Sequence, residues 1–259
     1  MSDLEFCTTR REGRVLVVTM NRPDVMNAVH APMHHEMSRI WDEFAADPDL
    51  WVAVLTGAGE RAFSAGNDLK YTAKGGRMKP PASGFAGLTS RLDLEKPIIA
   101  AVNGVAMGGG FETALACDLI LASSNATFAL PEPKVGFFAA TGGVQRLTRQ
   151  IGRKPAVDLL LTGRKVSAEE GQRLGFVNEV FEPGALMEKA MEKANEIASV
   201  SPSSIRATLR VLRHMDDMDN LRSSLLYSRQ VLLDLRETED FAEGVNAFVE
   251  KRKPEWKNR

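Results

Sequence analysis

The chain has 259 residues, which is enough for one large domain with a substantial buried core and excludes a peptide-sized binding module. Its 33 Lys and Arg against 34 Asp and Glu give a formal net charge of -1, so no overall field favours nucleic acid or an anionic membrane. Only Cys7 and Cys117 are present, far apart, which argues against a disulfide scaffold and favours a reducing compartment. We therefore expect a cytoplasmic protein.

The first residues carry an acid pair and no apolar segment, so they resemble no targeting signal. Every apolar run is far shorter than the roughly 18 residues that cross a bilayer, and we expect no membrane association. Strands rich in Val, Ile, Leu and Ala are predicted over residues 14–20, 51–56, 97–102 and 118–122. Helices are predicted over 31–46 and 109–116. Strands that alternate with helices predict a layered α/β fold.

Residues 57–87 are rich in Gly, Pro, Lys and Ala and are too long for a plain connection, so we expect a functional or mobile loop. From residue 183 onward the composition turns helical, with helices predicted over 185–200, 202–215, 220–235 and 237–250. We predict a catalytic core over 1–183 and a helical lobe over 184–259. The third helix has more apolar surface than a lone helix can hide, which favours packing on the core or on a second subunit.

A glycine triplet, Gly108-Gly109-Gly110, follows a strand and precedes the helix of residues 109–116. Its N–H groups can be approached closely because no Cβ blocks them, and such groups bind negative charge. The Lys and hydroxyl of a P-loop do not follow, so a developing oxyanion suits the triplet better than phosphate. Glu112 lies in the first helical turn, where a plain capping role is the alternative. Glu132 lies between two prolines, where a rigid turn is the alternative.

The stretch 98–112, Ile-Ile-Ala-Ala-Val-Asn-Gly-Val-Ala-Met-Gly-Gly-Gly-Phe-Glu, resembles the central signature of the enoyl-CoA hydratase/isomerase (crotonase) family. Later blocks of that family are matched in order by residues 117–122, 128–132, 142–147 and 161–163, and earlier ones by 21–28 and 62–69. The resemblance covers nearly the whole chain. It implies a crotonase-like fold of repeated ββα units with a C-terminal helical lobe, and assembly as a homotrimer or a hexamer made of two trimers.

The same resemblance implies that Asn67 and Gly109 donate backbone N–H groups to a thioester oxygen. Glu at both acidic positions is typical of the hydratases, which add water across the double bond of an enoyl-CoA in fatty acid β-oxidation. Water activation falls to Glu112 and proton donation to Glu132. Two close carboxyl groups in a partly desolvated cavity also resist ionising together, which permits one acid and one base.

Contacts to the acyl-CoA substrate are implied for Val25, Met26, Asn67, Gly109 and Ala140, and for the segment Ala65, Asp68, Leu69 and Lys70. Coenzyme A is then part of the substrate, and neither a separate cofactor nor a metal is expected. Residues 136–143 lack the Pro and Gly often seen in short-chain hydratases, so Phe137, Phe138 and Ala140 leave the acyl group open. A carnitinyl-CoA dehydratase-like lyase, another lyase or isomerase of the family, and a thioester hydrolase remain alternatives.

A non-enzyme alternative is an RNA-binding protein on a crotonase scaffold. Arg206, Arg210 and Arg213 form a basic helical stripe that would serve it, although a solvated helix face explains the stripe equally. Other motifs have little support. Residues 57–62 fit the glycine spacing of a dinucleotide fingerprint, but no acidic residue follows about 20 positions later. His30 and His34 have helical spacing, but residues 35–39 break the zinc-protease motif.

Overall fold

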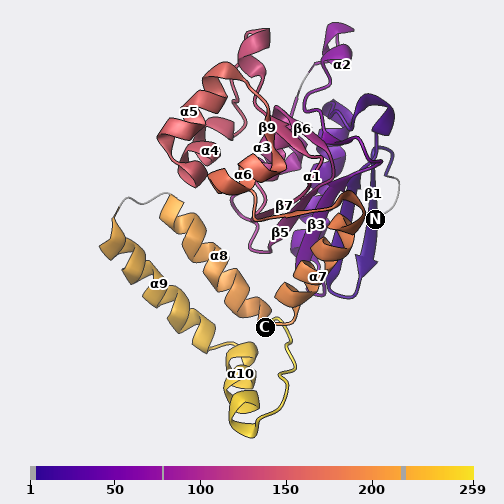
Figure 1. Ribbon diagram of the computed structural model, residues 1–259. Helices are drawn as coiled ribbons and strands as arrows, with labels where there is room; N and C mark the ends of the chain where they lie inside the picture. Colours follow the sequence, from indigo (N-terminus) through magenta and orange to yellow (C-terminus); the bar gives the residue numbers. More distant parts are fainter. Residues whose placement is uncertain (1–3, 78, 217–219) are drawn as a thin grey trace.

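The structure is a computed structural model that describes residues 4–77, 79–216 and 220–259. Within these residues, six strands form one sheet in the order β1-β2-β3-β5-β7-β10 and four form a smaller sheet in the order β4-β6-β8-β9 (Figure 1). The large sheet is parallel except for its edge strand β1, which runs antiparallel to β2. The predicted α/β class is confirmed. Its strands are β1 (Cys7–Glu12), β2 (Val15–Met20), β3 (Val52–Gly57), β4 (Ala62–Ser64), β5 (Ile98–Val102), β6 (Val105–Met107), β7 (Leu119–Ser123), β8 (Thr127–Ala129), β9 (Val166–Ser167) and β10 (Glu179–Phe181).

From β3 to β8, successive strands alternate between the large sheet and the small sheet. In the described chain, the pairs β3–β4, β5–β6 and β7–β8 each place the first strand in the large sheet and the second in the small one. Helix α3 (Gly109–Leu115) begins directly after β6, which confirms the expected ββα pattern. The remaining helices of the core are η1 (Pro23–Val25), α1 (Ala31–Ala46), α2 (Leu69–Ala73), η2 (Phe85–Gly87), η3 (Glu132–Val135), α4 (Gly143–Ile151), α5 (Arg153–Thr162), α6 (Ala168–Leu174) and η4 (Pro183–Ala185).

Both faces of the large sheet are covered, which explains why its strands read as continuous apolar runs. Alternate residues of β2 point to opposite faces: Leu16 and Val18 pack with α1, whereas Val15 and Val17 belong to the core cluster of α7 (Leu186–Ala198). Helix α1 has the predicted bounds, and its apolar face, which includes Trp41, is buried. Burying each such large side chain contributes about 1.5–3 kcal/mol.

The four C-terminal helices lie within two residues of their predicted bounds: α7, α8 (Pro202–Asp216), α9 (Leu221–Arg236) and α10 (Glu239–Glu250). They do not all behave alike. Helix α7 packs on the sheet, whereas α8 touches the sheet mainly through its first turns and α9 lies beside α8 (Figure 1). Leu221 on α9 is 71% exposed and Phe248 on α10 is 87% exposed. The apolar surface expected of this lobe is therefore present and lies open in the single chain.

The long segment 57–87 contains β4, α2 and η2, and its last part is anchored to α1. The Ala86 N–H donates to His34 Nδ1 over 2.9 Å, and Trp41 Nε1–H donates to the Ala86 carbonyl over 3.1 Å. Ala86 is held at φ +52, a conformation that non-glycine residues seldom adopt. The turn at η2 is thus held in place by α1, and it carries Phe85, which reaches the cavity described below.

His34 gives a testable pH dependence of stability. Burial, followed by repulsion from His35 and His30, lowers the pKa of His34 from 6.5 to about 4. The unfolded chain therefore binds a proton at His34 more readily than the folded chain does. As the pH drops from 6.5 to about 4, the free energy of unfolding should fall by on the order of 3 kcal/mol. Urea unfolding of parent and His34→Gln at about pH 7 and about pH 4.5 measures this term. The variant should lose much of the pH dependence.

The neighbouring His35 is exposed and supplies the matched control. His35→Gln should keep most of the pH dependence of the parent, because burial is the largest cause of the lowered His34 pKa and repulsion from His35 comes after it. If His34→Gln and His35→Gln follow the same curve, His34 is not the group that titrates on unfolding.

Candidate functional site

An open cavity of about 1130 Å³, counted to its mouth, lies between the start of α3, the 65–85 segment and the segment that follows β8. Most of its lining is apolar, and two carboxylates, Glu112 and Glu132, reach into it. The lining residues are Ala65, Asn67, Leu69, Thr72, Pro80, Phe85, Gly108, Gly109, Glu112, Pro131, Glu132, Val135, Phe137, Phe138, Ala140 and Thr141. The structure thus brings together residues that the sequence places far apart.

The glycine triplet lies where two backbone segments touch. A Cβ on Gly110 would lie 2.2 Å from the Ser64 carbonyl oxygen, and one on Gly66 would lie 3.0 Å from the Gly109 nitrogen. Only glycine therefore allows the 64–67 segment to run against the start of α3. Gly109 is the first residue of α3, so its N–H has no carbonyl partner within the helix.

Asn67 lines the same cavity. It forms an isolated parallel bridge with Val29, in which the Val29 N–H donates to the Gly66 carbonyl and the Asp68 N–H donates to the Val29 carbonyl. In a parallel bridge of this kind, the central residue turns its own N–H away from the partner. Asn67 and Gly109 thus line one cavity from adjacent segments, and the bridge and the helix leave the N–H of each without a carbonyl partner.

Glu112 is 3% exposed and lies in the first turn of α3. Its Oε1 accepts hydrogen bonds from the Thr141 N–H (2.8 Å) and the Gly143 N–H (2.9 Å). Its Oε2 accepts one from the Thr141 hydroxyl. Three donors therefore hold this side chain in one orientation.

Glu132 lies in a different environment. It begins η3 between Pro131 and Pro133, and its Oε2 is buried with no hydrogen-bond partner among the described residues. Burial raises the pKa of Glu132 to about 7, and the negative charge of Glu112 adds to this increase. A Cβ on Gly108 would lie 2.9 Å from Glu132 Oε1, so the carboxyl group rests against the glycine triplet. Two carboxyl groups in one cavity, one held by three donors and one with an unpaired oxygen and a raised pKa, suit a base and an acid.

Some predicted contact residues do not line the cavity in the described part of the chain. Asp68 caps α2 by accepting from the Tyr71 N–H and is paired with Arg22 at 2.9 Å, so its carboxylate is already occupied. Val25 and Met26 lie in and just after η1, and Lys70 is exposed on α2. Ala65, Leu69 and Ala140 do line it, as do Phe137 and Phe138.

Phe85 and Thr141 line the cavity but were not predicted as site residues. Phe85 packs on Gly109, since a Cβ on Gly109 would lie 2.5 Å from its ring. No sequence signal places Phe85 there, because its position depends on the anchoring of η2 to α1. Thr141 does carry a signal, namely a hydroxyl two residues before Gly143 at the start of a helix.

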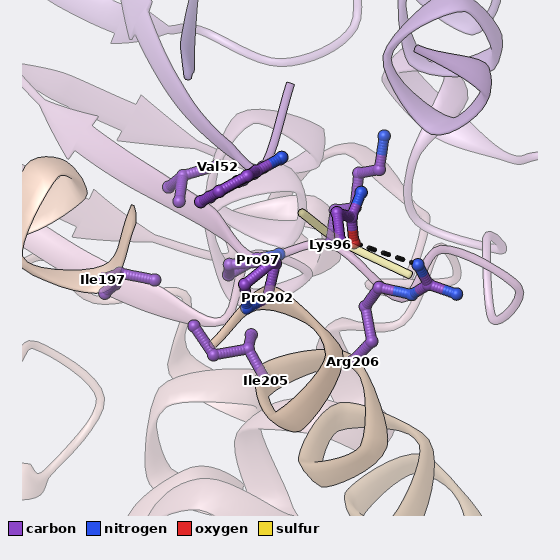
Figure 2. A pocket seen from close by; sticks show the side chains of 9 residues that line it. Val52, Lys96, Pro97, Ile197, Pro202, Ile205 and Arg206 are labelled. Carbon is purple, nitrogen blue, oxygen red and sulfur yellow. Dashed lines mark hydrogen bonds between the residues drawn. The ribbon is translucent and has the colours of Figure 1, made fainter. Parts of the chain in front are cut away.

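A second hollow, which is almost filled by side chains, lies where α8 meets the starts of β3 and β5, and Figure 2 shows Val52, Pro97, Ile205 and Arg206 around it. None of its lining residues is acidic. Its one amine, Lys96 Nζ, donates to the Phe44 carbonyl at 2.7 Å, near the end of α1. This hollow is a joint between α8 and the sheet, without the groups that chemistry would need.

The basic stripe on α8 is engaged within the chain. Arg210 donates to both carboxylate oxygens of Glu95 at 2.8 and 2.9 Å, and Arg206 donates to Asn258 at 3.0 Å. Arg213 lies 4.0 Å from Asp118. Contacts within the fold therefore account for the stripe.

Residues 4–77, 79–216 and 220–259 contain neither a metal-ligating cluster nor a membrane-spanning helix. No three His, Cys, Asp or Glu side chains in these ranges gather as a metal site would require. No helix in them combines the length and the apolar character needed to span a bilayer.

Comparison with known proteins extends the likeness over nearly all of the chain. The model of the enoyl-CoA hydratase/isomerase family matches residues 10–259. A carnitinyl-CoA dehydratase from Proteus mirabilis is 44% identical over 100% of both chains, and one from Escherichia coli O157:H7 is 43% identical over 96% of this chain and 97% of its own. The crystal structure of an enoyl-CoA hydratase from Mycobacterium tuberculosis superposes with a TM-score of 0.93 at 35% identity, covering 98% of this chain and 99% of its own.

Proposed function

Because the chain belongs to the enoyl-CoA hydratase/isomerase family, we propose that it is a hydro-lyase that acts at the 2,3 position of an acyl-CoA thioester. It adds water across the double bond or, in the reverse direction, removes it. The observation that carries this proposal is the pair of carboxyl groups in one cavity, with Glu112 held by three donors and Glu132 half-buried with its Oε2 unpaired among the described residues. Hydration needs one carboxylate to activate water and one acid to supply a proton.

In the hydration direction, Glu112 takes a proton from the water that attacks C3, and Glu132 gives its proton to C2. The thioester oxygen gains negative charge as this happens, and the Asn67 and Gly109 N–H groups stabilise it. Preorganised donors of this kind are worth about 10²- to 10³-fold in kcat each, because the charge appears only as the reaction proceeds. The cavity is also lined by Ala65, Leu69 and Ala140. These three residues lie beside Asn67, Gly109, Glu112 and Glu132, which supports the proposed role of the cavity in hydration.

Four of the proposed contacts to coenzyme A lie outside the cavity. Val25, Met26, Asp68 and Lys70 would meet the coenzyme, which is part of the substrate, and no separate cofactor takes part. The exposed apolar residues of α9 and α10 support assembly as a trimer or as two trimers. We keep the cytoplasm as the proposed compartment.

A second candidate concerns the acyl group. The curated relatives at 43–44% identity are named carnitinyl-CoA dehydratases, and a carnitinyl group carries a quaternary ammonium. Phe85, Phe137 and Phe138 line the cavity, and aromatic faces attract such cations. Dehydration of a carnitinyl thioester uses the same two glutamates in reverse, so the two candidates differ in substrate rather than in chemistry.

An acyl-CoA panel tests the proposal. The purified protein is given crotonyl-CoA, longer 2-enoyl-CoA homologues, and the quaternary-ammonium analogue crotonobetainyl-CoA, and loss of the enoyl-thioester absorbance is followed. We expect turnover of at least one of them. If none is hydrated, and none of the corresponding 3-hydroxyacyl-CoA esters is dehydrated, the proposed function is wrong.

The protonation of Glu132 predicts a pH limit. Burial raises the pKa of Glu132 to about 7, and its proposed role as acid requires the protonated form. We expect kcat/KM for hydration to fall as the pH rises through about 7, because kcat/KM reports the groups of the free enzyme. Initial rates measured from pH 5 to about pH 9 check this. A profile that stays flat across this range would contradict the assignment of Glu132 as the acid.

A further inference from the structure

Glu112 is gripped by a single short segment, residues 141–143. Thr141 supplies two of its three donors, the N–H to Oε1 at 2.8 Å and the hydroxyl to Oε2, and Gly143 supplies the third at 2.9 Å. An ionised carboxylate offers about four lone-pair positions, so about one of them stays free for a water. The Thr141 hydroxyl is the only donor on Oε2 among the described residues, so it fixes the carboxylate together with the two N–H groups on Oε1.

The segment has little freedom to move. Gly143 begins α4, and a Cβ there would lie 2.7 Å from the Ala139 Cβ and 3.0 Å from Glu112 Oε1. Gly142 has φ +111, and the Arg146 side chain packs on it. Arg146 Nη2–H also donates to the Thr89 carbonyl over 2.7 Å, which ties this segment to the chain beyond η2. The Thr141 hydroxyl is therefore presented to Glu112 by a fixed backbone.

We propose that Thr141 is the positioning residue that keeps the Glu112 carboxylate aimed at the attacking water. The inference rests on the proposed function, since it names the residue that makes Glu112 the base of that reaction. The hydroxyl donates a hydrogen bond to the Glu112 carboxylate. Such a bond stabilises the charged form of a carboxyl group more than the neutral acid. Two other ionisable groups act on Glu112 through space, Glu132 from η3 and Arg146 from α4. Neither is altered by a change at residue 141.

The test compares Thr141→Val, Thr141→Ser and Thr148→Val. Valine keeps the shape and the backbone N–H but lacks the hydroxyl, whereas serine restores it. Thr148 is half-buried on α4, and its hydroxyl donates to the Val144 carbonyl of its own helix, so Thr148→Val is the matched control for loss of a hydroxyl. The free energy of a hydrogen bond to a charged group corresponds to a factor of about 10 to 100 in a rate constant. We expect kcat of Thr141→Val to fall by that factor, with KM little changed.

The kcat/KM profile should also have an acidic limb, where Glu112 takes up a proton and no longer acts as a base, and in Thr141→Val this limb should move to higher pH because one donor to the carboxylate is lost. Thr141→Ser and Thr148→Val should keep the parental limb. A purely structural role would lower activity without moving the limb. Parental kcat/KM and an unmoved limb in Thr141→Val would overturn the proposal.

A second readout does not depend on turnover. In protein labelled with ¹³C at glutamate carboxyl carbons, the resonance lost in Glu112→Gln identifies Glu112, and its titration gives the pKa directly. A higher pKa in Thr141→Val than in the parent supports the role of Thr141 even where the parent hydrates no substrate. Equal titration curves overturn it. The absence of turnover in the parent, by contrast, counts against the proposed function alone.

Discussion

Glu112→Gln and Glu132→Gln are each expected to lower kcat/KM by about 10²- to 10⁴-fold, the range that positioned acids and bases supply. The amide keeps the shape of the side chain but neither takes a proton from water nor supplies one to carbon. Most of the loss should appear in kcat, because the carboxyl groups act on the reacting atoms and hold little of the rest of the substrate. Steady-state kinetics on the best substrate of the panel measure both parameters.

Glu237→Gln is the matched control, since Glu237 is exposed at the end of α9 and does not line the cavity. It should keep parental rates. The double variant should lose no more than the two single losses combined, because the two groups serve one transition state. If either single variant keeps the parental kcat, that glutamate is not part of the chemistry.

Gly110→Ala is expected to lower kcat by about 10²- to 10³-fold, the effect of losing one preorganised donor to the thioester oxygen. The new Cβ would lie 2.2 Å from the Ser64 carbonyl oxygen, so the backbone must move. Ser64 is itself fixed, because its hydroxyl donates to the Asn27 carbonyl at 2.8 Å and accepts from the Gly66 N–H at 3.1 Å. The displacement is therefore passed to Asn67, the next donor along the segment.

The same change should cost about 1–3 kcal/mol of stability through overpacking, which thermal unfolding measures. Gly184→Ala is the control, since a Cβ at Gly184 meets nothing within 4 Å. It should leave both rate and stability unchanged. A Gly110→Ala protein that folds and keeps the parental kcat would contradict the close packing of the two donor segments.

Much of the fold could be predicted because its core has strong periodic signals. Helix α1 matches its predicted bounds since its apolar residues recur every three to four positions, and the parallel strands were recognisable because they are buried on both faces. Strand β1 was not predicted, since its sequence Cys-Thr-Thr-Arg-Arg-Glu is polar and it forms the partly exposed edge of the sheet. The strands of the small sheet are two or three residues long, too short for a pattern.

The candidate site, like the fold, could be predicted only in part. Glu112 and Glu132 were chosen from the sequence because the signature around them resembles a family, and the structure brings both to one cavity. Local sequence explains the glycine triplet only in part, since the reason for Gly110 is the Ser64 carbonyl of another segment. Phe85 reaches Gly109 through a turn that α1 holds, and Thr141 meets Glu112 only after α4 packs beside α3. Such contacts are tertiary, and no window of sequence contains them.

The most direct test of the account is the mass of the product formed in water enriched in ¹⁸O. The purified protein is incubated with the enoyl-CoA that the panel identifies, and the CoA ester is analysed by mass spectrometry with fragmentation of the acyl group. The account predicts a product heavier by one water, with the heavy oxygen at C3 and the thioester intact. A product of unchanged mass, or free coenzyme A with the heavy oxygen in the released acid, would contradict it.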